Sequence, residues 1–200
     1  MIQIFEEGYF VNNRITDSRL SSVLNETKSF SAGTLMPNKT TVFLSHKHSD
    51  LSEMKDFLGF LEKMYNVAVY IDSKDPNMPE NTSGETAKRI KAIIKKCDKF
   101  ILLATDNAIE SKWCNWELGF GDANKYINNH IAILPIKKKG INDLYYKGKE
   151  YLYIYPCIAF YSGSEKYKDG SFIKAGYYVR TKDSNGNSNI TPLSDWLKKR

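Results

Sequence analysis

The stretch TTVFLSHKHSDLSEMKDFLGFLEKMYNVAVYID, residues 40–72, contains two short hydrophobic runs separated by a longer amphipathic segment. The first run, residues 40–46, is rich in β-branched and apolar side chains, which is typical of a buried strand. The second run, residues 67–72, has the same character. A strand, a helix and a second strand in this order predict the first unit of a parallel α/β sheet.

Apolar residues in the segment between the two runs recur at steps of three and four, which predicts an amphipathic helix. These residues are Leu51, Met54, Leu58, Leu61 and Tyr65. Ser49 or Asp50 precedes them and can cap the first turn of the helix.

The alternation of strands and helices continues through residue 136. We expect a loop at 73–84, a helix at 85–97, a strand at 99–106, a helix within 110–127 and a strand at 130–136. The predicted fold is therefore α/β, with a central, mostly parallel sheet and helices on both faces. Ligands bind such sheets at the carboxyl ends of the strands, here residues 45–48, 72–84 and 105–111.

The flanking segments are less regular. Residues 1–38 contain a short apolar stretch (IQIF) and a helical pattern around residues 15–24. Residues 151–160 and 172–179 look like strands, and an SNGN turn and a short helix (SDWLKKR) follow them. We see no linker between these parts. We therefore expect an N-terminal extension (1–38), an α/β core (39–137) and a β-rich addition (138–200) in one globule.

The net charge of +6, from 29 Lys+Arg and 23 Asp+Glu, is unevenly distributed. Residues 1–135 hold 16 basic and 17 acidic side chains, whereas residues 136–200 hold 13 and 6. The excess of +7 in the tail is most often a solvated surface. A neutral core without a recognition motif makes nucleic-acid binding the weakest functional interpretation.

The sequence also bears on compartment and metal content. No run of 18 apolar residues is present, and MIQIFEEGYF lacks the features of a secretory signal, so we expect no membrane span and no secretion. The three cysteines are Cys97, Cys114 and Cys157, an odd number without a CxxC pair. We therefore expect free thiols, a cytoplasmic location, no metal site and no bound cofactor.

Glu85 is the carboxylate with the most informative position. It opens the predicted helix after the Pro- and Gly-containing loop, close to the carboxyl end of the second strand, where it could face a ligand. The competing interpretation is a capping box, in which Thr82 caps the helix and Glu85 reaches back to its amide.

A second cluster comprises Trp113, Cys114, Trp116 and Glu117. The two indoles are three residues apart on one helix face, where one could stack on a ligand ring. Burial in the core is the alternative for these indoles, and Glu117 either orients a loop or is solvated.

The end of the first strand offers Ser45, His46 and His48. His46 and His48 could contact a phosphate or be plain loop residues. A Ser45–His46–Asp50 triad is too local for the usual constellation. Asp72 ends the second strand, but the acidic cluster that holds magnesium in phosphoacceptor receivers is missing beside it.

Together these motifs resemble those of the Toll/interleukin-1 receptor (TIR) domain family. TVFLSHKHSD resembles its first strand and loop, and VYIDSKDPNMPENTSGE resembles its second strand and the long loop before a helix. AIIKKCDKFILLATDNAIESKWCNWELGFG is similar to its third strand and its Ser-x-Trp-Cys-x-x-Glu-Leu element. The resemblance covers residues 39–137 and implies a TIR, flavodoxin-like fold.

The resemblance also implies a function. Many bacterial and plant TIR proteins cleave the nicotinamide–ribosyl bond of NAD+, and their catalytic glutamate corresponds in position to Glu85. A TIR domain with N- and C-terminal additions further resembles the TIR proteins of Thoeris antiphage defence, which make a cyclic ADP-ribose isomer that activates a separate effector. We therefore expect NAD+ as substrate and Ser45, His46, Asp72, Trp113, Cys114 and Glu117 around it. The resemblance allows self-association through TIR–TIR contacts.

Two other functions remain open at this point. One is a non-catalytic TIR scaffold that acts through TIR–TIR contacts, and the other is an enzyme resembling nucleoside deoxyribosyltransferases. A single carboxylate is chemically sufficient for NAD+ cleavage. The nicotinamide ring of NAD+ is a positively charged pyridinium, so nicotinamide leaves as a neutral molecule and no general acid is needed. The reaction thereby differs from glycoside hydrolysis with two carboxylates.

Overall fold

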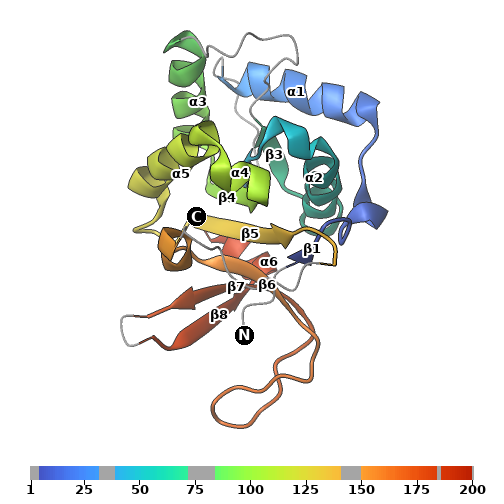
Figure 1. Cartoon of the computed structure of the whole chain (residues 1–200), viewed down its shortest axis with the longest axis vertical. Coiled ribbons are helices and arrows are strands. Elements are labelled where there is room, and N and C mark those ends of the chain that lie inside the picture. Colours follow the sequence, from blue (N-terminus) through green and yellow to red (C-terminus); the bar gives the residue numbers. More distant parts are fainter. Residues whose placement is uncertain (1–4, 32–38, 72–83, 141–149, 184–185, 200) are drawn as a thin grey trace.

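The computed structural model describes residues 5–31, 39–71, 84–140, 150–183 and 186–199. Within these ranges eight strands form one sheet in the order β3-β2-β4-β5-β6-β7-β8, and β1 pairs with β5 (Figure 1). The strands are β1 (Phe5–Glu6), β2 (Thr41–Ser45), β3 (Ala68–Ile71), β4 (Lys99–Ala104), β5 (Ile131–Lys137), β6 (Cys157–Tyr161), β7 (Gly176–Lys182) and β8 (Ser188–Pro192). All pairs from β3 to β6 are parallel, and β6-β7-β8 is antiparallel. The predicted mostly parallel α/β sheet is confirmed.

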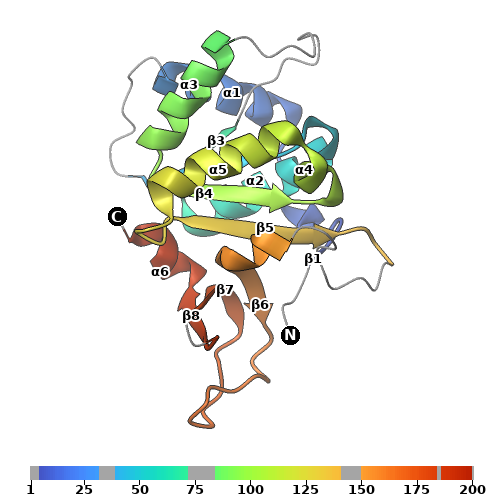
Figure 2. The same ribbon diagram turned by 60° about the vertical axis from the view of Figure 1, so that its left-hand side comes forward.

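Helices lie on both faces of the parallel part (Figure 2). The α-helices are α1 (Asp17–Ser31), α2 (Leu51–Tyr65), α3 (Gly84–Lys96), α4 (Asp106–Glu110), α5 (Lys112–Lys125) and α6 (Leu193–Lys198). Short 3-10 helices are η1 (Val11–Asn13), η2 (His48–Asp50) and η3 (Glu150–Ile154). None of the described helices is long and apolar enough to cross a membrane.

Strand β2 is buried along its whole length and contributes to two hydrophobic cores. Successive side chains of a strand point to opposite faces. Val42 and Leu44 therefore join the core beneath α2, whereas Phe43 joins the core beneath α3, α4 and α5. This double burial explains why residues 40–46 form a continuous apolar run.

The N-terminal residues pack on the α2 side of the sheet. Phe5 and Phe10 are buried in the α2 core, and α1 lies beside edge strand β3 and reaches α3. Arg14 donates to both carboxyl oxygens of the fully buried Asp56 on α2, at 2.5 and 2.9 Å. A two-pronged Arg–carboxyl contact of this kind is geometrically specific, so it fixes where this segment meets α2.

The C-terminal helix α6 closes the amino end of the sheet. Trp196 is buried, and its indole Nε1 donates to the carbonyl of Asn129 at 2.7 Å. Lys99, at the start of β4, lies 4.8 Å from the Trp196 ring centroid and donates to the carbonyl of Lys199 at 2.6 Å. Burial lowers the pKa of Lys99 to about 8.

Three local predictions are wrong. The segment predicted as a strand at 151–160 begins as η3, and the strand starts only at Cys157. Pro156 lacks the N–H that a ladder needs, and the Tyr155 amide closes a turn onto Leu152 instead. The strand predicted at 172–179 begins at Gly176, and Phe172 lies exposed in the preceding loop, where it forms an isolated bridge with Lys166.

The third error concerns elements without a hydrophobic pattern. Strand β8 has the polar sequence SNITP, and it is specified by pairing with β7 rather than by its own side chains. Helix α4 begins at Asp106, within the strand predicted at 99–106, because the Thr105 side chain accepts the amide N–H of Ala108 at 3.1 Å. Only five residues long, α4 is too short to show a helical period.

Two glycines provide a matched test of the packing between α2 and the N-terminal segment. A Cβ at Gly59 would lie 1.9 Å from the Asn13 carbonyl oxygen, whereas one at Gly119 on α5 would meet nothing within 4 Å. We expect Gly59→Ala to lower the free energy of unfolding by about 3 kcal/mol or more, because backbone must move. Gly119→Ala should raise it by up to about 1 kcal/mol. Urea denaturation of both variants checks this, and equal effects would contradict the packing.

Candidate functional site

The structure describes the part of the predicted ligand edge that lies at the carboxyl ends of β2 and β4. Asp72 and residues 73–83, including the proposed cap Thr82, lie outside the described residues. The predicted capping box between Thr82 and Glu85 therefore lies partly outside the described residues.

Ser45 and Glu117 meet beneath this edge. Ser45 ends β2 on the face covered by α5, and its hydroxyl donates to the Glu117 carboxyl group at 2.5 Å. Both residues are at most 1% exposed. Glu117 is buried because it shares a helical stripe with Cys114, Leu118 and Gly121. In this conformation the pair joins α5 to β2, and a direct substrate contact would require the pair to be uncovered.

Cys114 belongs to the same buried layer. Its amide N–H donates to the Ser111 side chain, which caps α5, at 3.4 Å. Burial raises the pKa of the Cys114 thiol to about 11, and the nearby Glu117 carboxyl group adds to the increase. A thiol with this pKa stays protonated near neutral pH and is a poor nucleophile.

Asp50 provides a second connection, which the sequence analysis missed. Its carboxyl group accepts hydrogen bonds from Thr105 Oγ1 and from Asn107 Nδ2, the latter at 2.5 Å. Asp50 does occupy the N-cap position of α2, but its side chain makes no capping bond there. The prediction that Asp50 or Ser49 caps α2 is therefore wrong, because the Asp50 carboxyl group is used by α4 and the Ser49 hydroxyl donates to it.

His46 lies in the loop between these two connections and is partly buried. Its Nδ1 is 3.4 Å from the Leu44 carbonyl oxygen. Burial lowers the pKa of His46 to about 4, although the Leu44 carbonyl opposes the shift. The imidazole is therefore neutral near pH 7 and carries no positive charge for a phosphate.

An aromatic stripe on α5 holds α3 in place. The rings of Trp113 and Trp116 have centroids 4.7 Å apart, and Phe120 continues the stripe at 6.3 Å from Trp116. Lys91 of α3 reaches over the rings of Trp116 and Phe120, at 5.9 and 5.1 Å from their centroids. One turn later Lys95 lies over Phe120, so α3 and α5 run in the same direction.

Glu85 is exposed in the first turn of α3. Lys91 follows it by six residues, a rise of about 9 Å along a helix. Glu85 belongs to the first turn of α3 and Trp113 to the first turn of α5, and these helices follow the carboxyl ends of β3 and β4. Trp113 is partly buried and packs against the core beneath α3, α4 and α5.

The structure therefore divides the predicted site residues into two groups. Ser45, Cys114 and Glu117 form a buried support, whereas Glu85, His46 and Trp113 retain exposed surface. The described residues contain no group of three or more His, Cys, Asp or Glu side chains that could hold a metal ion. The contact between Asp50 and Thr105 could have been predicted from the sequence, because both residues follow parallel strands whose carboxyl ends lie at one edge of the sheet.

Removing the Asp50 charge tests the connection between the two loops. In Asp50→Asn the new amide places a donor opposite Thr105 or Asn107, so we expect about 1–3 kcal/mol less stability. Asp106→Asn on α4 is the control, since Asp106 is exposed and makes no described hydrogen bond through its side chain. It should cost less than about 1 kcal/mol. Chemical denaturation measures both, and similar losses would argue against a connecting role.

His46 predicts a specific pH dependence. Its folded pKa lies below the usual 6.5, so protonation favours the unfolded chain. The stability contributed by neutral His46 is complete above about pH 6.5 and is lost as pH falls towards about 4. His46→Gln should therefore flatten the stability profile across this window, by up to about 1.4 kcal/mol per pH unit. Denaturation midpoints from pH 4 to 7 test it, with exposed His48→Gln as the control, and a wild-type slope in His46→Gln would refute it.

One known protein is similar to this chain in sequence. The chain is 31% identical over 120 residues to the "Probable 3' cyclic ADP-D-ribose synthase ThsB'" of Bacillus cereus (strain MSX-D12). The match covers 59% of this chain, and the chain spans about 60% of the length of that curated relative.

A protein family also matches the chain over more than half of its length. The match is to the TIR domain and runs from residue 42 to residue 168. It begins within β2, includes the parallel strands through β6, and extends into the loop that follows. Most residues of both cores, the Ser45–Glu117 pair and Glu85 lie inside it. The chain therefore belongs to the TIR domain family.

Proposed function

We propose that this TIR protein cleaves the nicotinamide–ribosyl bond of NAD+ and forms a cyclic ADP-ribose isomer, with Glu85 as the catalytic carboxylate. The observation that carries the proposal is the position of Glu85, which is exposed in the first turn of α3, the helix that follows the carboxyl end of β3. The name of the 31% identical relative supports the product class.

The proposed chemistry needs one carboxylate. As the bond between ribose C1′ and the pyridinium nitrogen breaks, its electron pair goes to nicotinamide, which leaves as a neutral molecule. Positive charge then develops on the ribose as an oxocarbenium-like centre. A carboxylate held nearby stabilises this charge most effectively where water is excluded. Glu85 is the residue to which we assign this role.

The acceptor of the ribosyl centre then determines the product. Water gives ADP-ribose, whereas a nucleophilic atom of the same molecule closes a ring. Ring closure requires the adenosine end to fold back and water to be kept away from C1′. We assign the stacking of a substrate ring to Trp113, and the rigid placement of the surrounding loops to Ser45, Glu117 and Asp50.

We further propose that the product is a small-molecule signal in antiphage defence and activates a separate effector. This places the protein in the cytoplasm, where its three buried free thiols remain reduced. TIR–TIR self-association belongs to the same proposal.

Glu85→Gln tests the catalytic assignment. The substitution keeps size and polarity but removes the charge that stabilises the ribosyl centre, so we expect nicotinamide release to fall at least about 100-fold. Chromatography of NAD+ incubated with wild type and variant measures nicotinamide, ADP-ribose and cyclic products.

The matched control is Asp195→Asn, because Asp195 is likewise an exposed acid in the first turn of a helix and lies at the amino end of the sheet. It should fold and retain turnover, which separates catalysis from a general helix-dipole effect. Undiminished product from a folded Glu85→Gln protein would end the assignment. No NAD+ turnover by wild type at any concentration would favour a non-catalytic scaffold, and turnover of nucleosides alone would favour a deoxyribosyltransferase-like enzyme.

A further inference from the structure

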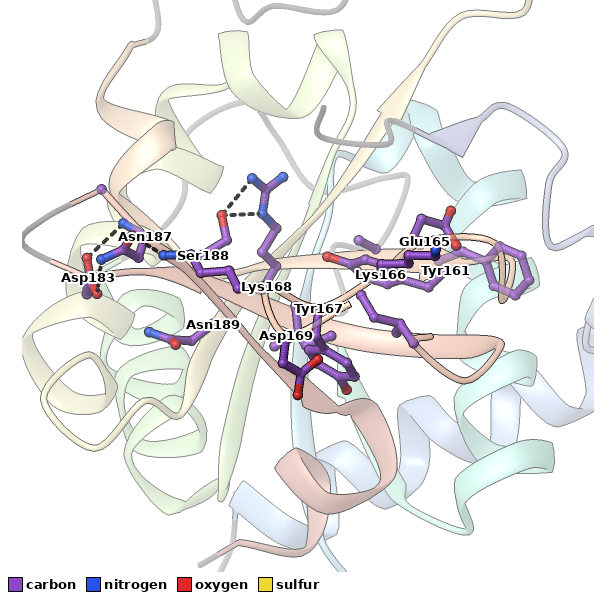
Figure 3. A pocket seen from close by; sticks show the side chains of 16 residues that line it. Tyr161, Glu165, Lys166, Tyr167, Lys168, Asp169, Asp183, Asn187, Ser188 and Asn189 are labelled. Carbon is purple, nitrogen blue, oxygen red and sulfur yellow. Dashed lines mark hydrogen bonds between the residues drawn. The ribbon is translucent and has the colours of Figure 1, made fainter. Parts of the chain in front are cut away.

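A groove of about 910 Å³ lies in the C-terminal part of the sheet, away from the proposed NAD+ site. It runs between the loop after β6 and the β7–β8 hairpin (Figure 3). Asp183 and Asn187 lie at one end of the groove, and Tyr161, Glu165 and Lys166 lie at the other. Since β2 and β4 stand at the opposite side of the strand order, this groove is distinct from the edge near Glu85.

Three cationic side chains line the groove, and the partners of all three are neutral. Arg180 donates through Nε and Nη2 to the Ser188 hydroxyl, at 3.1 and 2.8 Å. Lys168 donates to the side-chain carbonyl of Asn187 at 2.5 Å, and Lys166 lies 4.7 Å from the centroid of the Phe172 ring. Each cation therefore lacks a contacting anion among the described residues.

The Arg180 guanidinium has N–H groups that can make further hydrogen bonds. Its Nη1 makes no hydrogen bond within the described residues, and the side chain is partly exposed. Ser188 holds two of its five N–H groups and fixes the plane of the fork. A guanidinium held in this way matches two oxygens of a phosphate or carboxylate group.

Acidic side chains also line the groove, but two of them are used to shape its loop. Glu165 accepts hydrogen bonds from the Ser162 amide, the Ser162 hydroxyl and the Gly163 amide. Asp169 accepts the amide and hydroxyl of Ser171. These bonds lower the pKa of both carboxyl groups, so both are ionised at neutral pH. The formal charge of the lining is balanced, and an anion would be selected by contact rather than by long-range attraction.

Size and aromatic surface narrow the ligand class. The volume is in the range of small-molecule sites and exceeds what inorganic phosphate needs. Tyr167 lines the groove with 44% of its surface exposed, so its ring is available to stack on a planar base. Tyr161 and Ser188 add hydroxyl groups suited to a ribose or phosphate.

We propose that this groove binds a nucleoside diphosphate, with the phosphates on Arg180 and Lys168 and the base on Tyr167. The site is independent of the NAD+-cleaving edge, so it can be occupied whether or not Glu85 is catalytic. It gives a specific role to part of the positive charge that is concentrated in residues 136–200.

The test is a titration of the full-length protein with ADP, followed by calorimetry and by backbone amide NMR. We expect saturable binding, with the largest shifts between residues 157 and 190. Arg180→Gln should weaken binding about 10-fold or more, and Arg180→Lys should recover part of it because it restores charge but not the fork. Lys182→Gln is the matched control, since Lys182 is an exposed cation on the same strand and does not line the groove.

Two further ligands separate the parts of the proposal. Adenosine should bind at least about 10-fold more weakly than ADP, and so should inorganic phosphate. If phosphate alone binds as tightly as ADP, the base contact is refuted, and if adenosine does, the phosphate contact is refuted.

A final arm separates this site from the proposed NAD+ site. Binding of ADP to Glu85→Gln should be unchanged. Shifts confined to the ends of α3 and α5, or equal binding by folded Arg180→Gln, would overturn the proposal.

Discussion

The double burial of strand β2 is the constraint on which the rest of the structure depends. Its side chains alternate between two cores, so β2 must be covered by helices on both faces and flanked by β3 and β4. A short strand with this environment has one stable register, because a slip by one residue would exchange its two faces. The ends of the neighbouring parallel strands are then aligned, and the loops after β2 and β4 are brought together.

This alignment explains why buried polar contacts are concentrated at one edge. Ser45 must be placed beneath α5, where Glu117 accepts its hydrogen bond. Asp50 must be placed beside Thr105 and Asn107. Buried polar groups are costly unless they are hydrogen-bonded, so these contacts favour a single arrangement of the two loops and of α5. The exposed Glu85 is therefore presented by a helix whose position is set by packing rather than by Glu85 itself.

The parts of the fold that could be predicted are those with a continuous apolar run or a helical period. Strands β2 and β5 have such a run and helix α2 has such a period, and each lies within a few residues of its predicted bounds. Strand β8 and helix α4 could not be found in this way, because one is specified by its pairing partner and the other by a side-chain cap. Pro156 precedes the start of β6, but Pro135 lies inside β5, so a proline alone does not determine where a strand starts.

The position of the site could be predicted from the sequence, but the role of each residue in it could not. Sequence spacing places Ser45, Cys114 and Glu117 near the strand ends, yet it cannot distinguish a side chain that faces a ligand from one that supports the wall. Burial makes that distinction, since a side chain with almost no exposed surface acts through its neighbours. Glu85 and Trp113 differ from the supporting residues in this respect, because Glu85 is exposed and Trp113 is only partly buried, in the first turns of two helices that the Lys91–Trp116 contact joins. The geometry of the proposed catalytic end is therefore determined by contacts a full helical turn or more away from it.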